Sequence, residues 1–464
     1  MRIWIALLVL SAALLVPAKR AYAQDPGPML LPPGVVRLGA AGIYNELPVE
    51  SHIWPLHYET FAPLRPVGGD LIRFFEETGG AAPVVTAEDL TAGELELGLS
   101  GDARTVPFSL AIGVLPRLEL GVRVPVTRGE TAFRRYQLTG GNVGLNSEAE
   151  FNAGILSEFA TIGATLGGQP LLPTDGSPLG QALQARVVAL TGGDSLRLPD
   201  NALTFDQLRQ LLVGEFGPAP LTSARSDWAL GDAEITARIG LFDTSPDETY
   251  PTNRTGFNYR GVASVAVRLP TGTSSDPTLL FSHAPIGGLT GYSVGLRNDL
   301  FYGDNIWLTA SAEFSDLLAA EVERRLVSPD QPLADLTNPA LLSWAPPTTL
   351  RIDLSPRYRL TSAISLGLRY ALVRQGESTY EMAEPGSLPM DDVIGPAVLN
   401  TAATTAHLFG AGVRFTTIPN AFDADGLPFE IGLNYLTGIG DDGPLAGSTL
   451  TVQGSLFHRF WGGG

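Results

Sequence analysis

The sequence predicts an all-β protein, a transmembrane antiparallel up-and-down β-barrel of about 12 strands with a long, partly helical extracellular insertion. Three observations predict this class. The chain begins with an export signal, apolar and polar residues alternate over segments long enough to cross a bilayer, and short links alternate with long ones. Composition agrees, because charged residues make up only 17% of the chain, and its 53 glycines and 36 prolines favour turns over long helices.

The first residues have the pattern of a secretory signal peptide. Arg2 supplies a positive charge, an unbroken run of apolar or small residues follows, and Ala21-Tyr22-Ala23 is a small-x-small cleavage pattern. The apolar run is shorter than the roughly 20 residues that a membrane-spanning helix needs. We therefore expect residues 1–23 to be a signal peptide and residues 24–464 to form the barrel.

The chain contains no cysteine, which excludes disulfides, thiol catalysis and thiolate metal sites. Every later apolar run is interrupted by a charged residue, glycine or proline, so the sequence predicts no spanning helix. An exported chain of this kind is soluble, anchored to a surface, or a closed barrel in an outer membrane.

The alternation of apolar and polar residues is clear between residues 118 and 126. One face of this segment is apolar and consists of Leu118, Leu120, Val122, Val124 and Val126. The opposite face consists of Glu119, Gly121 and Arg123. Similar segments of about 9 to 13 residues recur along the chain, which matches a tilted membrane strand better than the shorter strands of soluble sheets. The opposite faces lack lysine, which favours a confined polar lumen over an open surface.

We place the strands near 34–44, 93–114, 118–126, 231–243, 259–269, 291–302, 306–315, 347–360, 364–374, 404–417, 428–438 and 449–461. The alternation changes phase within 93–114, because the apolar residues Leu95 and Leu97 are odd-numbered whereas Phe108 and Leu110 are even-numbered. This change of phase indicates either a bulge or a hairpin near residues 101–104. If it is a hairpin and 34–44 is not a strand, the count is unchanged.

The links between the predicted strands are of two kinds. Short links are Leu115-Pro116-Arg117, Gly303-Asp304-Asn305 and Thr361-Ser362-Ala363, and long ones are 127–228, 316–346 and 381–402. Outer-membrane barrels show this asymmetry, with short periplasmic turns and long extracellular loops. An even strand number places both termini in the periplasm. Aromatic residues near strand ends are typical of interfacial girdles, namely Tyr302, Trp307, Tyr358, Phe415, Tyr435, Phe460 and Trp461.

Two long segments interrupt the strand pattern. Residues 127–228 contain two expected helices, 179–190 and 204–216, and form either a solvated external cap or a constriction folded into the barrel mouth. Residues 45–92 include five aromatic residues that suit a second lid or a periplasmic hatch: Trp54, Tyr58, Phe61, Phe74 and Phe75.

The segment GVLPRLELGVRVP at 113–125 resembles the strand–turn–strand signature of bacterial outer-membrane proteins of the meta-pathway phenol-degradation group, which are related in architecture to FadL-like hydrocarbon and fatty-acid channels. Members of that group usually carry a Leu-Thr-Asp-Arg turn, whereas this chain has a shorter one. Further similar segments are Ala229-Leu230-Gly231-Asp232, Leu269-Pro270-Thr271-Gly272, and LPPGVVRLG, which starts at Leu31. The resemblance covers roughly residues 32–461 outside the long insertion and implies a passive route for small apolar or aromatic compounds.

The strand phase assigns charged side chains to the barrel interior as candidates for a solute path. The arginines are Arg123, Arg238, Arg268, Arg297, Arg351, Arg357, Arg359, Arg369, Arg414 and Arg459, and the carboxylates are Glu119, Glu234, Asp299, Glu313, Asp353 and Glu430. In one interpretation these groups pair and fill a narrow, rigid barrel. In the other, the excess of arginine lines a pore that favours anions or the π-faces of aromatic solutes.

The sequence argues against other chemistry. Of the five histidines only His407 and His458 fall in predicted strands, and neither has a plausible serine partner, so we expect no enzyme. Asp423-Ala424-Asp425-Gly426 starts like a calcium loop but lacks the downstream ligands, so we expect no metal and no cofactor. The net charge of −18 makes nucleic acid and anionic lipid poor partners. The expected partners are outer-membrane lipid and a small solute, with the chain as a monomer.

Overall fold

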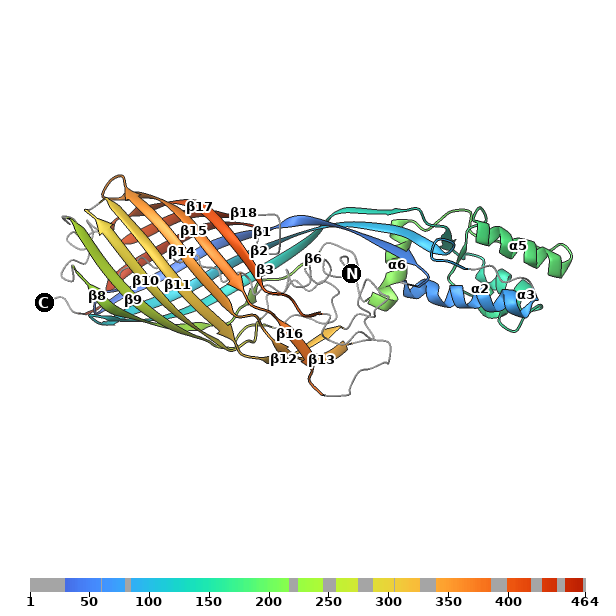
Figure 1. Cartoon of the computed structure of the whole chain (residues 1–464), viewed down its shortest axis with the longest axis horizontal. Coiled ribbons are helices and arrows are strands. Elements are labelled where there is room, and N and C mark those ends of the chain that lie inside the picture. Colours follow the sequence, from blue (N-terminus) through green and yellow to red (C-terminus); the bar gives the residue numbers. More distant parts are fainter. Residues whose placement is uncertain are drawn as a thin grey trace.

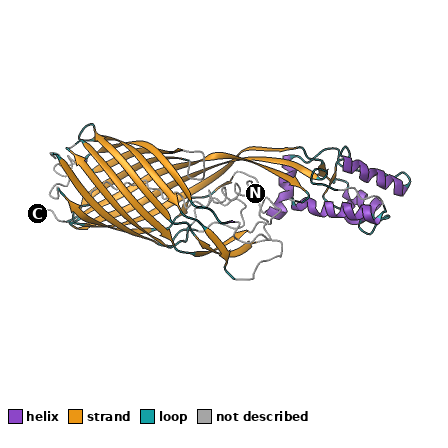
Figure 2. Ribbon diagram, in the orientation of Figure 1, coloured by secondary structure: helices purple, strands orange, loops and turns teal. Residues whose placement is uncertain are grey.

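The structure is a computed structural model that describes residues 30–59, 61–79, 85–216, 224–244, 256–273, 287–303, 305–325, 339–384, 399–418, 428–439 and 447–461. It consists of a β-barrel, a stalk of long strands and a helical head at the far end of the stalk (Figures 1 and 2). The predicted signal peptide, residues 1–23, lies outside the described residues.

Twelve antiparallel strands close the barrel. They are β1 (Val35–His57), β2 (Thr91–Leu115), β3 (Leu118–Thr139), β8 (Glu234–Asp243), β9 (Phe257–Arg268), β10 (Gly291–Tyr302), β11 (Ile306–Leu317), β14 (Thr349–Arg359), β15 (Ile364–Gln375), β17 (Thr404–Thr416), β18 (Phe429–Ile439) and β19 (Ser448–Arg459). Each strand pairs with the next in this order, and β1 also pairs with β19, which leaves no free edge. The predicted fold class and strand number are confirmed.

The two ends of the barrel differ in the length of their links. The turn between β2 and β3, the turn between β14 and β15, the start of β1 and the end of β19 share one end. The opposite end carries the stalk and the long links. In the register, Val35 lies beside Arg459, so the barrel closes where the first and last strands meet.

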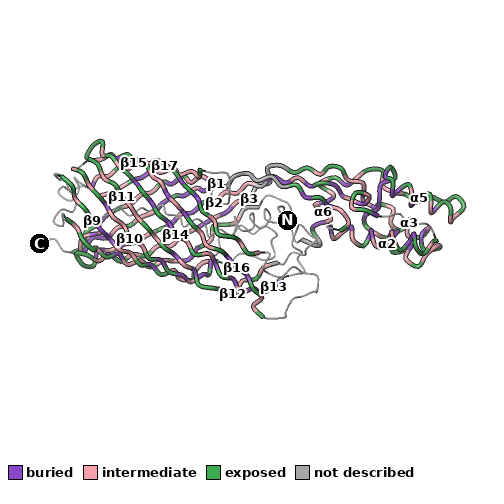
Figure 3. Tube along the Cα trace, in the orientation of Figure 1, coloured by how far each residue is buried: buried purple, intermediate pink, exposed green. Residues whose placement is uncertain are grey.

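The outer wall of the barrel is apolar. Alternate side chains along each strand are exposed on this wall, among them Leu120, Ile235, Val294, Leu354 and Val452, whereas their sequence neighbours are more buried (Figure 3). In a closed barrel this pattern places lipid outside, because only an apolar solvent favours such a surface. The protein is therefore a transmembrane barrel of the outer-membrane type. No helix among the described residues is long and apolar enough to cross a membrane.

The first three strands continue beyond the barrel as the stalk, so β1 and β3 are much longer than predicted, whereas β2 agrees closely with its predicted range. The predicted change of phase within 93–114 is neither a hairpin nor a bulge of β2, which is one continuous strand. Register shifts occur in its pairings with β1 and β3. Leu95 and Leu97 belong to the odd face and are buried in the head, whereas Phe108 and Leu110 belong to the even face and are exposed on the barrel wall.

The head is assembled from both long segments. Its elements are η1 (Ala62–Leu64), α2 (Arg65–Glu77), β4 (Val143–Leu145), α3 (Ala149–Leu156), α4 (Gly163–Gly167), β5 (Leu171–Pro173), α5 (Pro178–Thr191) and α6 (Phe205–Phe216). The two predicted helices correspond to α5 and α6. One apolar core joins Phe74 and Leu71 of the first segment to Leu183 and Leu208 of the second. The stalk holds the helices beyond the barrel rather than inside it (Figure 2).

A small sheet stands at the same end of the barrel as the stalk. It consists of β12 (Ala320–Arg325), β13 (Pro339–Ala345) and β16 (Thr379–Met382). Trp344 and Tyr380 stack in its core with ring centroids 5.7 Å apart. Two short strands, β6 (Ala224–Arg225) and β7 (Ala229–Leu230), add to the edge of β3 beside it.

Candidate functional site: the barrel interior

The interior of the barrel is lined by the polar face of the alternating strands. A group of ionised side chains lies near the short-turn end. Glu119, almost fully buried, accepts hydrogen bonds from Arg37 Nη2 at 3.1 Å, from Arg238 Nη1 at 3.0 Å and from the backbone N–H of Leu31 at 3.0 Å. One carboxylate of β3 therefore binds an arginine of β8, its neighbour in the barrel, and an arginine of β1, two strands away on the other side.

A second group lies on β14 and β15. Asp353 accepts hydrogen bonds from Arg351 Nε at 2.6 Å and from Arg369 Nε at 2.8 Å, and Arg369 Nη2 lies 2.7 Å from the same carboxylate. Glu313 faces Arg351 in the register of β11 with β14. This arrangement fixes two guanidinium groups in the middle of the interior.

Two internal cavities lie on either side of these arginines. The larger, of about 190 Å³, is bordered by the group around Glu119 together with Arg123, Glu234, Arg297 and Glu313. The smaller, of about 70 Å³, is bordered by Arg357, Arg414 and polar residues of β18 and β19. Arg351 and Arg369 border both cavities, so their side chains form the partition between them.

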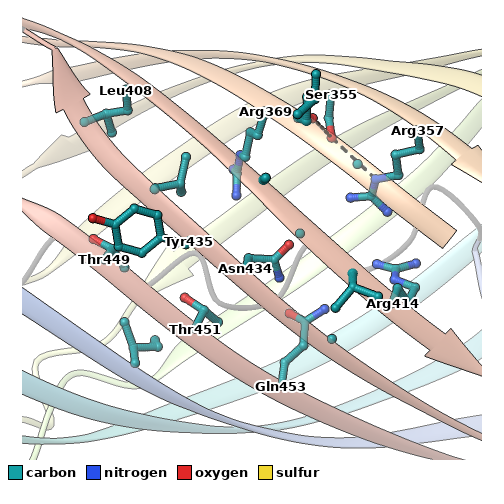
Figure 4. Close-up of a pocket in the computed structure, with 18 of the residues that line it drawn as sticks. Ser355, Arg357, Arg369, Leu408, Arg414, Asn434, Tyr435, Thr449, Thr451 and Gln453 are labelled. Atoms are coloured by element: carbon teal, nitrogen blue, oxygen red, sulfur yellow. Dashed lines mark hydrogen bonds between the residues drawn. The ribbon is translucent and has the colours of Figure 1, made fainter. Parts of the chain in front are cut away.

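The smaller cavity has two chemically different sides. Arg357, Arg369 and Arg414 lie on one side, and Asn434, Thr451 and Gln453 lie across from them (Figure 4). The apolar side chains of Ile43, Leu408 and Leu436 also border it. Gly412 and Gly432 belong to the inward face of β17 and β18 and border the cavity, and the side chains of Asn434 and Gln453 occupy the positions that a Cβ atom on these glycines would need.

Most of the remaining candidate residues are also distributed along the interior, whereas Arg459 is exposed at the end of β19. Arg123 and Glu234 are register partners on β3 and β8. Asp299 accepts a hydrogen bond from Thr309 Oγ1 at 2.8 Å, and Arg414 lies 3.9 Å from Glu430. Arg357 Nε lies 3.4 Å from Ser355 Oγ.

Arg268 is bound at the stalk end of the barrel. Its Nε and Nη2 atoms lie 2.8 and 2.7 Å from Asp232 Oδ2. The Asp232 carboxylate also accepts hydrogen bonds from the backbone N–H groups of Gly272, Gly288 and Leu289. The segments around Gly231-Asp232 and Thr271-Gly272, which carried part of the sequence resemblance, therefore contact each other.

The sequence analysis missed several members of the interior. Arg37, Asp232, Asp243 and Arg260 all form ion pairs there, and Arg260 Nε lies 2.6 Å from Asp243 Oδ2. Strand parity could have found Arg37 and Arg260, because each occupies an inward position of a predicted strand. These residues add two arginines and two carboxylates, so the excess of arginine over carboxylate among the interior residues is unchanged.

One predicted girdle residue is placed wrongly. Trp307 shares the inward face of β11 with Thr309 and lies beside Arg357 in the register, so it belongs to the lumen. The other girdle candidates, Tyr302, Tyr358, Phe415, Tyr435, Phe460 and Trp461, are exposed.

The two strand histidines lie among aromatic residues. A ring nitrogen of His407 is 2.9 Å from the Tyr370 hydroxyl, and His458 packs edge-on against Phe460. Within the described ranges, no group of three or more histidine or carboxylate side chains could hold a metal ion. The loop at 423–426 lies outside these ranges.

No protein-family model matches the chain, and no curated protein matches it in sequence. Solved structures similar in fold include a channel, a transporter and a FadL homologue. An outer membrane channel from Pseudomonas putida F1 is 9% identical, with a TM-score of 0.42 over 94% of this chain and 100% of that one. The Pseudomonas putida toluene transporter TodX is 10% identical, with a TM-score of 0.30 over 96% and 92%. A Pseudomonas aeruginosa FadL homologue is 10% identical, with a TM-score of 0.29 over 97% and 94%.

Proposed function

We propose that the protein is an outer-membrane channel through which small molecules, apolar or aromatic ones in particular, cross passively via the barrel interior. The observation that carries this proposal is the pair of internal cavities that share Arg351 and Arg369 in their linings. A barrel filled for rigidity alone would be packed closely and would not need two polar cavities in its interior.

The chemistry of the lining suits solutes with an apolar body. Guanidinium groups bind the π-faces of aromatic rings as well as anions, and Arg357, Arg369 and Arg414 present such groups to the smaller cavity. Ile43, Leu408 and Leu436 offer an apolar contact on its border. A passing solute would displace Arg351 and Arg369 from Asp353, so the resting channel is narrow and opens transiently.

The orientation follows from the links. Barrels of this class place short turns in the periplasm and long loops outside the cell. The head and the small sheet of β12, β13 and β16 would then face the exterior, and both ends of the barrel-forming chain would face the periplasm.

The test is single-channel recording of the refolded barrel in planar bilayers with a salt gradient. The expected result is a small current that favours anions over cations. Replacing Arg351 and Arg357 by glutamine should reduce this anion selectivity. Small aromatic solutes should block the current reversibly. Arg117→Gln, in the exposed turn between β2 and β3, is the matched control. A folded barrel that gives no current and no solute-dependent signal contradicts the proposal.

One observation favours a second function. The head has its own apolar core, independent of the barrel, so it could act as a surface-interaction module carried by a structural barrel with a closed lumen. In that case the Arg369→Ala variant would conduct no current across the bilayer, because the ion pairs that close the lumen would only make the barrel rigid.

A further inference from the structure

Two arginines face lipid at the stalk end of the barrel. Arg104 of β2 and Arg128 of β3 are direct register partners, and Arg104 lies on the same outward face as Phe108. Towards the short turns the next outward positions are apolar, with Val106 opposite Val126, and towards the stalk they are acidic, with Asp102 opposite Glu130. The arginines therefore mark the boundary of the apolar belt.

An aromatic ring flanks each arginine. The guanidinium carbon of Arg104 is 5.7 Å from the ring centroid of Tyr44 on β1, and that of Arg128 is 5.7 Å from the ring of Trp228. Trp228 is half exposed. Tyrosine and tryptophan gather at the depth of lipid headgroups, so this row across neighbouring strands lies at the membrane surface.

The arrangement is unfavourable as it stands. Like charges directly opposite each other on neighbouring strands are destabilising. Asp102 offsets the charge of Arg104 only at 3.7 Å. Nη2 of Arg128 is buried and has no hydrogen-bond acceptor within the described part of the chain, so an anion on the outer wall would contact the other N–H groups of this guanidinium. An anion with several acceptor oxygens between the two guanidinium groups would relieve the repulsion between them.

We propose that Arg104 and Arg128 bind the phosphate of a lipid headgroup in the extracellular leaflet. Arginine binds phosphate through paired N–H donors, and the lipid chains would lie along the apolar wall at Val106 and Val126. The net charge of −18 disfavours anionic lipid over the molecule as a whole, but charges beyond about 8–10 Å are screened. Asp102 and Glu130 lie within that range on the stalk side of the arginines, whereas the phosphate would contact both guanidinium groups directly. The inference depends on the barrel orientation and not on solute transport.

The test uses native mass spectrometry of the full chain in detergent. The probe is phosphatidic acid, whose headgroup is a bare phosphate, and diacylglycerol is the same lipid without it. The wild-type protein should retain phosphatidic acid in preference to diacylglycerol. Replacing Arg104 and Arg128 together by glutamine should weaken this binding roughly tenfold to a hundredfold, because two charge-assisted hydrogen-bonding groups are lost.

Arg117→Gln, in the turn that joins the same two strands, is the matched control and should leave binding unchanged. Heat-modifiable migration on gels checks that each barrel is folded. If the glutamine variant does not fold, the variant with lysine at both positions replaces it in the test. Lysine keeps the charge but not the paired donors, so this variant should bind the lipid weakly. The proposal is overturned if the double glutamine variant binds phosphatidic acid as strongly as the wild type does. An equal loss in the Arg117 variant also overturns it, as does displacement of the lipid by inorganic phosphate, which would indicate a site for free anions.

Discussion

The buried carboxylate of Asp232 provides the sharpest test of how the barrel mouth is held. Its side chain is inaccessible to solvent and joins Arg268 of β9 to the backbone N–H groups of Gly272, Gly288 and Leu289. Asp232→Ala removes the common acceptor of all these donors. Breaking a buried, hydrogen-bonded ion pair in this way costs about 3–5 kcal/mol, because the donors keep their desolvation cost without their acceptor.

The assay is urea unfolding of the barrel in micelles, followed by tryptophan fluorescence and by heat-modifiable migration on gels. With a urea dependence of about 1–3 kcal/mol per molar, typical of small proteins, the midpoint should fall by roughly 1 to 5 M. Asp316→Ala is the control, because that carboxylate makes an exposed 3.3 Å contact with the Tyr292 hydroxyl at the same end of the barrel. A midpoint shift for Asp232→Ala no larger than that of the control would refute the anchoring role.

Three further changes test other parts of the molecule. Arg369→Ala removes part of the partition between the two cavities, and single-channel conductance should rise; an unchanged conductance would place the constriction elsewhere. Leu71→Ala creates a void in the head core and should lower the stability of the head to proteolysis by about 2–5 kcal/mol while the barrel keeps its gel mobility. Leu110→Arg places a charge on the lipid-facing wall and should destabilise the barrel by about 2–4 kcal/mol in urea titration, whereas Ser311→Arg, on the inward face, should cost less; equal losses would mean that the two faces are misassigned.

The barrel could be predicted from the sequence because its physics is local. Each strand alternates with period two between a lipid side and a lumen side, so the phase of one segment suffices to assign its faces. Leu120 and Glu119 were assigned to opposite faces in this way, and the structure exposes the first and buries the second. The same rule, applied to aromatic residues as well as to charged ones, places Trp307 on the lumen side of its strand.

The head and the ion-pair partners could not be predicted, because they depend on contacts between distant parts of the chain. Phe74 and Leu183 share a core although more than a hundred positions separate them, and neither segment has a sequence pattern that predicts this contact. The partners of Asp232 lie in the link after β9, the second strand along the chain from it, at backbone N–H groups that the sequence does not distinguish. Strand parity selects the face of a residue, whereas only the closed register selects its neighbour.

The stalk explains why the phase of β2 misled the sequence analysis, and it also has a mechanical consequence. In the barrel an apolar side chain must point outwards to lipid, whereas in the head it must point into a core surrounded by water. Leu97 and Leu110 thus obey the same hydrophobic effect on opposite faces of one unbroken strand. Because β1, β2 and β3 run through both bodies without a linker, a force on the head acts directly on the strand that carries Glu119 and Arg123. Any ligand that moved the head would therefore act on the lining of the larger cavity through paired backbone, a much stiffer connection than a flexible loop.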